Sequence, residues 1–236
     1  MRWSVNVGRP FGIRVELHVT FLLFVGWIAV DGGLLAGRWG SAATAVALLL
    51  LAFGCVVLHE LGHALAARRF GIATRDIVLL PFGGVARLER MPERPQQELL
   101  VASAGPAVNA AIAVLLALLL AVTRHPTALD DLRGGLIENL LLVNVLMVLF
   151  NLLPAFPMDG GRVLRALLAL RLSHARATRV ATLVGQGAAL LLAVAGPALF
   201  HSGMLVVVAL FVFLAAGQER AMAGARETPP RCAAGA

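Results

Sequence analysis

Residues 41–69 read SAATAVALLLLAFGCVVLHELGHALAARR, and this stretch decides how the rest of the chain is interpreted. Residues 41–58 carry no charged side chain and are rich in Ala, Leu and Val. An uncharged apolar run of about 18 residues or more is typical of a helix that crosses a membrane. The sequence therefore predicts a membrane-spanning helix over residues 41–69.

The motif HELGH lies inside this predicted helix, at residues 59–63. Side chains four residues apart lie on one face of a helix, so His59 and His63 can bind the same zinc ion. With the helix ending at residues 68 and 69, His59 lies roughly 13 Å inside it at about 1.5 Å per residue. Without a metal, the motif would be two interfacial histidines and a glutamate that faces water. Ionisable residues in a membrane span usually face a polar cavity, which favours the functional interpretation.

The composition excludes an ordinary soluble domain. The 236 residues are 59 % hydrophobic and 14 % charged, and the mean hydropathy is +0.86. These values indicate a membrane protein with several spans. The formal net charge of +7 rests on arginine alone, and the arginines flank apolar runs. We therefore expect contact with the lipid bilayer and no nucleic-acid partner. Two cysteines are too few for a disulfide framework or a cysteine-based zinc site.

The predicted fold class is an all-α polytopic membrane protein with a small membrane-associated β-sheet. Alternating patterns within residues 3–17 and 75–88 predict strands, which should lie at the membrane face or inside the protein because strand edges cannot end in hydrocarbon. A tight turn at Gly196-Pro197 is expected to separate the last two spans. The predicted spans number six, at about residues 18–35, 41–69, 98–122, 135–153 with a broken continuation to 172, 178–195 and 198–216.

The arginine distribution predicts the orientation of these spans. Six spans place both termini on one side, and this side carries all the arginines except Arg38, Arg124 and Arg133. The positive-inside rule then makes both termini cytoplasmic, together with the mouth of the motif helix, in a multi-pass protein of the cell membrane. Residues 1–217 are expected to form a single membrane-embedded domain, and residues 218–236 a flexible cytoplasmic tail.

A catalytic zinc site typically has three protein ligands, so two histidines leave one to be found. The stretch NLLPAFPMDGG at residues 151–161 must break a helix, and broken backbone at membrane depth is tolerated beside a cavity. Asp159 in this stretch is our third ligand; the alternative is a turn-forming Asp-Gly pair. Solvation explains the other candidate carboxylates, and an interfacial position explains His18. The carboxylates set aside in this way are Glu89, Glu93 and Glu98. After the break, arginines at 162, 165 and 171 predict a basic amphipathic helix near lipid headgroups.

Three motifs together resemble those of the site-2 protease family of intramembrane zinc metalloproteases. They are HELGH at residues 59–63, Gly105-Pro106-x-x-Asn109, and Asn151-x-x-Pro154-x-x-Pro157-x-Asp159-Gly160-Gly161. The stretch PFGG at residues 81–84 is similar to the compact prokaryotic branch of the family. No segment resembles an inserted PDZ domain, and we expect no appended regulatory domains.

The resemblance implies one zinc ion per chain, held by His59, His63 and Asp159, with Glu60 as the catalytic acid and base. Zinc lowers the pKa of its water to about 7, while Glu60 takes the water proton and passes it to the leaving amine. Asn109 and Asn151 are expected to donate hydrogen bonds to the oxyanion or to the substrate backbone. A hydrogen bond between helices is the simpler role for Asn109.

The leading hypothesis is an intramembrane zinc endopeptidase that cleaves a membrane-anchored regulatory protein, the expected partner. The substrate must unwind locally, and the predicted strands offer an edge with which it can pair. The alternative is a non-catalytic metal-binding transporter or sensor that uses the same ligands. Glu60 separates the two hypotheses, because transport needs the ligands but no acid or base beside them.

Overall fold

The computed structural model describes residues 3–90, 92, 94–123, 135–200 and 204–227. The chain forms two compact units. The first comprises Met1–Pro92 and Ala104–Leu149, and the second comprises Glu93–Ser103 and Phe150–Ala236. Each unit has buried apolar clusters of its own.

A four-stranded mixed sheet lies in the first unit, with the strands in the order β1-β2-β3-β4. The alternating patterns predicted the strands; the outer pairs are antiparallel hairpins, and β2 pairs with β3 in parallel. The parallel pairing joins segments far apart in the chain, and no local sequence pattern predicted it. The strands are β1 Ser4–Gly8, β2 Arg14–His18, β3 Thr74–Leu80 and β4 Gly83–Leu88.

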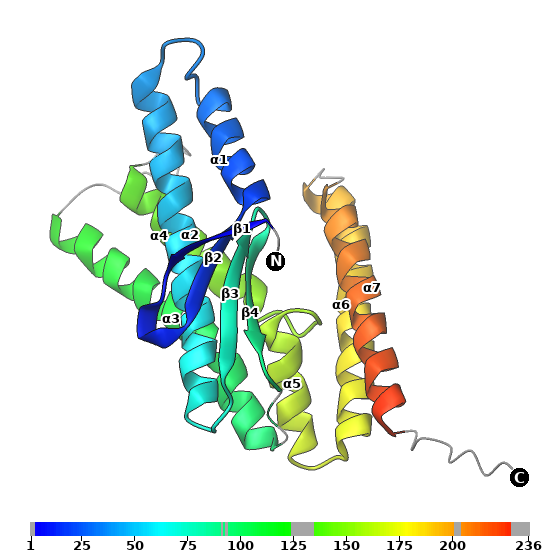
Figure 1. Ribbon diagram of the computed structural model, residues 1–236. Helices are drawn as coiled ribbons and strands as arrows, with labels where there is room; N and C mark the ends of the chain where they lie inside the picture. Colours follow the sequence, from blue (N-terminus) through cyan, green and yellow to red (C-terminus); the bar gives the residue numbers. More distant parts are fainter. Residues whose placement is uncertain (1–2, 91, 93, 124–134, 201–203, 228–236) are drawn as a thin grey trace, which may run out of the picture. The chain divides into compact units, whose positions relative to one another are not determined.

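The motif helix α2, Trp39–Arg68, packs against α1 and against strands β3 and β4 of this sheet (Figure 1). Its sheet-facing positions are small or aliphatic: Leu61 and Ala64 form a buried cluster with Ile13 and Ile77. Close packing on a small side chain such as Ala64 brings the sheet near the helix backbone. The sheet therefore runs beside the HELGH motif.

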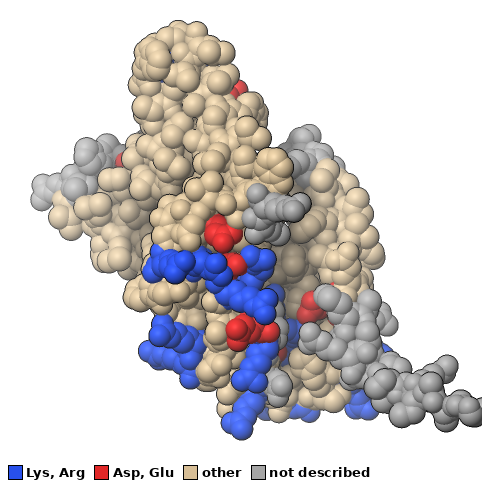
Figure 2. Space-filling view, in the orientation of Figure 1, with Lys and Arg blue, Asp and Glu red and all other residues tan. Residues whose placement is uncertain are grey.

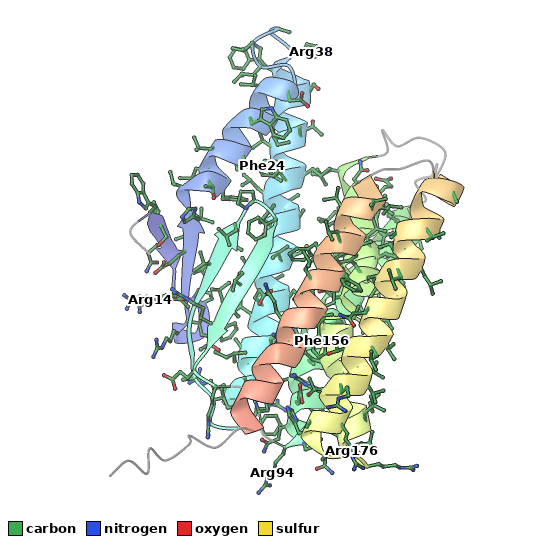
Figure 3. The ribbon with its side chains drawn as sticks, turned by 90° about the vertical axis from the view of Figure 1, so that its right-hand side faces the viewer. Arg14, Phe24, Arg38, Arg94, Phe156 and Arg176 are labelled. Carbon is green, nitrogen blue, oxygen red and sulfur yellow. The ribbon has the colours of Figure 1, made fainter. Side chains whose placement is uncertain are left out.

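Helix α1, Val19–Asp31, is shorter than the predicted span 18–35, because glycines follow it and Gly33 adopts a left-handed φ of +104°. Its N-cap is His18, whose Nδ1 accepts a hydrogen bond from the Thr20 N–H at 3.3 Å. A capping histidine has a structural role, in line with setting His18 aside as a ligand. Figure 3 shows Phe24 on α1 and Arg38 near the turn into α2.

Two further helices contribute to both units. Helix α3, Pro95–Thr123, begins in the second unit and continues in the first, with Pro106 inside it. Helix α4, Leu136–Asn151, lies in the first unit up to Leu149. The Arg124 and Arg133 of the predicted loop between them lie outside the described residues.

The second unit contains α5 Asp159–Ala169, α6 His174–Phe200 and α7 Met204–Glu227. Helices α6 and α7 lie side by side (Figure 3). The predicted turn at Gly196-Pro197 is wrong, because α6 continues to Phe200. A Cβ on Gly196 would lie 2.6 Å from Leu205 Cβ, so this glycine serves a close helix contact rather than a turn. Helix α7 also continues past residue 217 to Glu227, where we expected a flexible tail; residues 228–236 lie outside the described part.

Within the described residues, three helices are long and apolar enough to span a membrane: Trp39–Arg68, Pro95–Val122 and His174–Gly196. Val19–Asp31, Leu136–Asn151 and Leu205–Glu219 are apolar but shorter. In the first unit, the upper part of α1 and α2 presents a nearly uncharged surface, whereas charged atoms gather lower, over the sheet (Figure 2). The chain is thus mostly helical with a small sheet and has membrane-protein character, and the predicted number of six spans stays a prediction.

Candidate metal centre

His59 and His63 are buried side chains of α2. Their side chains are 4 % and 8 % exposed, and their Nε2 atoms are 3.1 Å apart. Two nitrogens at about 2.05 Å from one tetrahedral zinc ion would be roughly 3.3 Å apart. The observed separation therefore suits two ligands of one zinc ion.

Gly105 on α3 leaves the room that these two imidazoles need. A Cβ at this position would lie 2.2 Å from His63 Nε2 and 2.6 Å from His59 Nε2. No side chain larger than hydrogen fits there without moving the rings. The Gly105 of the sequence motif thus keeps a space open at the two nitrogens, as an ion bound by them would require.

A hydrogen bond from Asn109 on α3 sets the orientation of the His59 ring. His59 Nδ1 and Asn109 Oδ1 are 2.5 Å apart, and Asn109 Nδ2 donates to Asn144 Oδ1 at 2.8 Å. Because the Asn109 oxygen accepts, His59 Nδ1 carries the hydrogen and Nε2 keeps its lone pair. His59 is therefore in the tautomer that a metal ligand at Nε2 needs.

The Glu60 side chain contacts strand β4 of the sheet. Its Oε2 accepts a hydrogen bond from the Ala86 N–H of β4 at 3.2 Å. A Cβ on Gly84 would lie 2.9 Å from Glu60 Cγ, so β4 can approach only because this position is a glycine. Glu60 is partly buried, and its carboxylate lies at the sheet edge formed by β4.

Asp159 lies in the second unit, as the first residue of α5, with 9 % of its surface exposed. The predicted break is confirmed, because α4 ends at Asn151 and α5 begins at Asp159. A Cβ on Gly160 would lie 2.2 Å from the Leu153 carbonyl oxygen. The first turn of α5 can therefore pack closely against the preceding turn only because residue 160 is a glycine. A carboxylate at a helix N-terminus is also favoured by the helix dipole.

The residues predicted for the site are thus divided between the units. His59, Glu60, His63 and Asn109 come together in the first, whereas Asn151 and Asp159 stand at the two ends of the helix break in the second. Asn151, the last residue of α4, is partly buried. Asn109 is fully buried and contacts α2 and α4, which matches the simpler role of a hydrogen bond between helices.

Sequence reasoning missed the buried charges around Arg165 on α5. Arg165 donates to Glu98 Oε1 at 2.8 Å from Nε and to Glu219 at 2.6 Å, and its guanidinium lies 5.1 Å from the Phe156 ring centre. Glu98 and Arg165 are each 6 % exposed. Two expectations were therefore wrong: Glu98 is not explained by solvation, and Arg165 does not face lipid headgroups.

A small mixed sheet, long apolar helices and a buried HExxH histidine pair give this chain the character of a membrane protein with a candidate metal centre. Residues 45–136 and 135–195 match the model of peptidase family M50. The chain therefore belongs to peptidase family M50.

Relatives support this membership. A zinc metalloprotease of Methanocaldococcus jannaschii is 37 % identical over 224 residues, which cover 93 % of this chain and 61 % of the relative. The solved structure of a site-2 protease from the same organism is 36 % identical, with a TM-score of 0.60, and the match covers 92 % of this chain and 95 % of that chain. The chain spans between 50 % and 61 % of the length of the curated relatives that it matches.

Proposed function

We propose that this protein is an intramembrane zinc endopeptidase that hydrolyses a peptide bond in or near a transmembrane segment of a membrane-anchored regulatory protein. The observation that carries the proposal is the buried histidine pair with its Nε2 atoms 3.1 Å apart and Glu60 next to it in the chain. Membership of peptidase family M50 and relatives named zinc metalloproteases support it.

One zinc ion per chain would be held by His59, His63 and Asp159. The donor set of two imidazoles and a carboxylate suits a catalytic zinc, which keeps a further position open. When bound, zinc supplies a Lewis acid that activates water and polarises a carbonyl group. All three side chains are buried, with 4 %, 8 % and 9 % of their surface exposed.

Glu60 is the proton carrier in this proposal. Its carboxylate accepts a proton from the attacking water and delivers it to the leaving amine. The Ala86 N–H holds Glu60 at the edge of β4, so a substrate strand that pairs with this edge would arrive beside the acid and base. Substrate alignment and proton transfer are thereby placed next to each other.

The two asparagines of the predicted site have different roles in this proposal. Asn151, at the end of α4, is proposed to donate to the oxyanion or the substrate backbone. Both donor positions of Asn109 are directed at Asn144 Oδ1 and Met147 Sδ, so the described contacts support a role in holding His59.

The proposal includes six spans with both termini cytoplasmic. Three helices of sufficient length, three shorter apolar helices and the arginine distribution support this arrangement. The released part of the substrate would then be cytoplasmic.

Co-expression with candidate single-span membrane proteins tests the proposal. Wild type should release a fragment, and Glu60→Gln should abolish release while zinc remains bound. Glu89→Gln, at an exposed glutamate directly after β4, is the matched control and should cleave normally. Cleavage by Glu60→Gln at the wild-type rate would refute the protease, whereas zinc movement into vesicles by Glu60→Gln would support the transporter.

A further inference from the structure

A continuous chain of buried amides extends from His59 on α2 to α4. Asn109 and Asn144 each have 0 % exposure, although neither motif nor composition drew attention to Asn144. Asn144 Nδ2 donates to the Leu140 carbonyl oxygen at 2.8 Å and to Cys55 Sγ at 3.4 Å. Asn109 Nδ2 donates to Asn144 Oδ1 at 2.8 Å and lies 3.6 Å from Met147 Sδ.

The direction of every hydrogen bond in this chain follows from its far end. The Leu140 carbonyl oxygen can only accept, so the atom of Asn144 next to it is the nitrogen, and Asn144 Oδ1 faces Asn109. Asn109 must then donate through Nδ2 and present Oδ1 to the imidazole. An amide orientation that is normally ambiguous is thus fixed by a backbone carbonyl.

The orientation of Asn109 decides which nitrogen of His59 keeps its lone pair. If the Asn109 amide turned over, its NH₂ group would face Nδ1, which would become the acceptor, and the hydrogen would move to Nε2. His59 could then no longer bind a metal through Nε2. Asn144 Oδ1 opposes this rotation, because it would face the Asn109 oxygen and leave two buried acceptors in contact.

We propose that Asn144 is a positioning residue for the metal centre: through Asn109 it holds His59 in the tautomer and orientation that present Nε2 to zinc. This inference rests on the proposed zinc function. It adds a residue on a third helix, two hydrogen bonds away from the ligand, that contacts neither metal nor substrate.

The test measures zinc affinity by chelator competition with the purified full chain in detergent. Asn144→Leu keeps the branched shape of the side chain but removes the acceptor, and we expect the zinc affinity to fall roughly 10-fold. Asn144→Thr, whose hydroxyl can still bond the Leu140 carbonyl but is too short to hold Asn109, should give the same fall and serves if the leucine variant does not fold. Asn139→Leu on the same helix, whose amide bonds the Gly135 carbonyl instead, is the matched control and should bind zinc normally.

The same Asn144 substitution in a second variant, Asn109→Asp, distinguishes a positioning role of Asn144 from a role in helix packing. In Asn109→Asp both carboxylate oxygens accept, so His59 Nδ1 keeps its hydrogen whatever stands at position 144. In Asn109→Asp a carboxylate oxygen faces Asn144 Oδ1, so adding Asn144→Leu removes a contact between two acceptors and should not lower the zinc affinity. Cobalt(II) absorption spectra of the two proteins should coincide.

Two results would overturn the inference: an unchanged zinc affinity in both Asn144 variants, or an equal fall in the wild-type and Asn109→Asp backgrounds. The first leaves Asn144 without influence on the ligand, and the second reduces it to helix packing. Neither touches the proposed protease, which fails separately if wild type binds no zinc or if Glu60→Gln cleaves normally.

Discussion

The two compact units hold their candidate zinc ligands by different means. In the first, neutral amides in a directional chain set the ring of His59, and Gly105 leaves space at the two Nε2 atoms. In the second, backbone packing sets Asp159, which begins α5 where Gly160 presses against the preceding turn. The difference follows from the ligands: an imidazole needs a chosen tautomer as well as a position, whereas either oxygen of a carboxylate offers a lone pair.

The surroundings differ in charge as well. The described hydrogen bonds of Asn109 and Asn144 involve neutral partners only. Asp159 instead starts a helix whose Arg165 is paired with two glutamates and stacked against Phe156. Loss of the amide chain in the first unit should therefore lower metal affinity, and loss of the Arg165 ion pairs in the second should lower stability.

The largest effect is expected from removing a ligand in either unit. Alanine at His59, His63 or Asp159 should reduce the zinc content of the purified protein from about one per chain to nearly none, because a catalytic site has about three protein ligands. Metal analysis of the purified variants measures this. Asp31→Ala, an exposed carboxylate at the end of α1, should leave zinc content unchanged. If Asp159→Ala retained full zinc, the metal centre would be confined to the first unit.

Arg165 provides the next largest effect, on stability. Replacing Arg165 by Met leaves Glu98 buried and unpaired, which should lower the free energy of unfolding by about 3–5 kcal/mol. Thermal or denaturant unfolding in detergent measures the loss. Adding Glu98→Gln should restore much of it, because the buried charge is then gone. A single Arg165→Met change that left stability intact would contradict the idea that charge holds the second unit together.

Whether a feature of these two regions could be predicted from the sequence depends on how far apart in the chain the interacting residues lie. The apolar run ending in HELGH, the strand alternation and the Pro- and Gly-rich break are local patterns, and each predicted its element. The partners of Arg165 lie 67 and 54 residues away, so no spacing pointed to them. Asn144 looked like one polar residue in an apolar helix. The turn predicted at Gly196 and Pro197 was wrong, because a long apolar helix can contain both residues when its neighbours satisfy the backbone groups that they free.

Gly105 should show the next effect, on the first unit. Gly105→Ala places a methyl group against both imidazoles, and we expect zinc affinity to fall roughly 10–100-fold, the range seen when support for a ligand is disturbed. Gly54→Ala on α2, where a Cβ meets no atom within 4 Å, is the matched control. Chelator competition compares the two. Equal affinity in both variants would show that the space at Gly105 is not needed for metal.

The smallest effect is expected at Arg87, which tests whether charge also supports the first unit. Arg87 donates hydrogen bonds to Asp76 at 2.5 and 2.6 Å, and this hydrogen bonding raises the pKa of Arg87 above its ordinary value. A raised pKa means that the stabilisation is fully present below the ordinary value, so it should not vary between about pH 6 and 9. The Arg87 side chain is 42 % exposed, so water screens the pair, but the Asp76 side chain is only 7 % exposed and would lose this partner. Arg87→Met should therefore cost about 1–2 kcal/mol of unfolding free energy. Zinc affinity should not change, since the pair lies on the sheet and not in the amide chain; a fall comparable to that of Gly105→Ala would mean that charge on the sheet also holds the histidines.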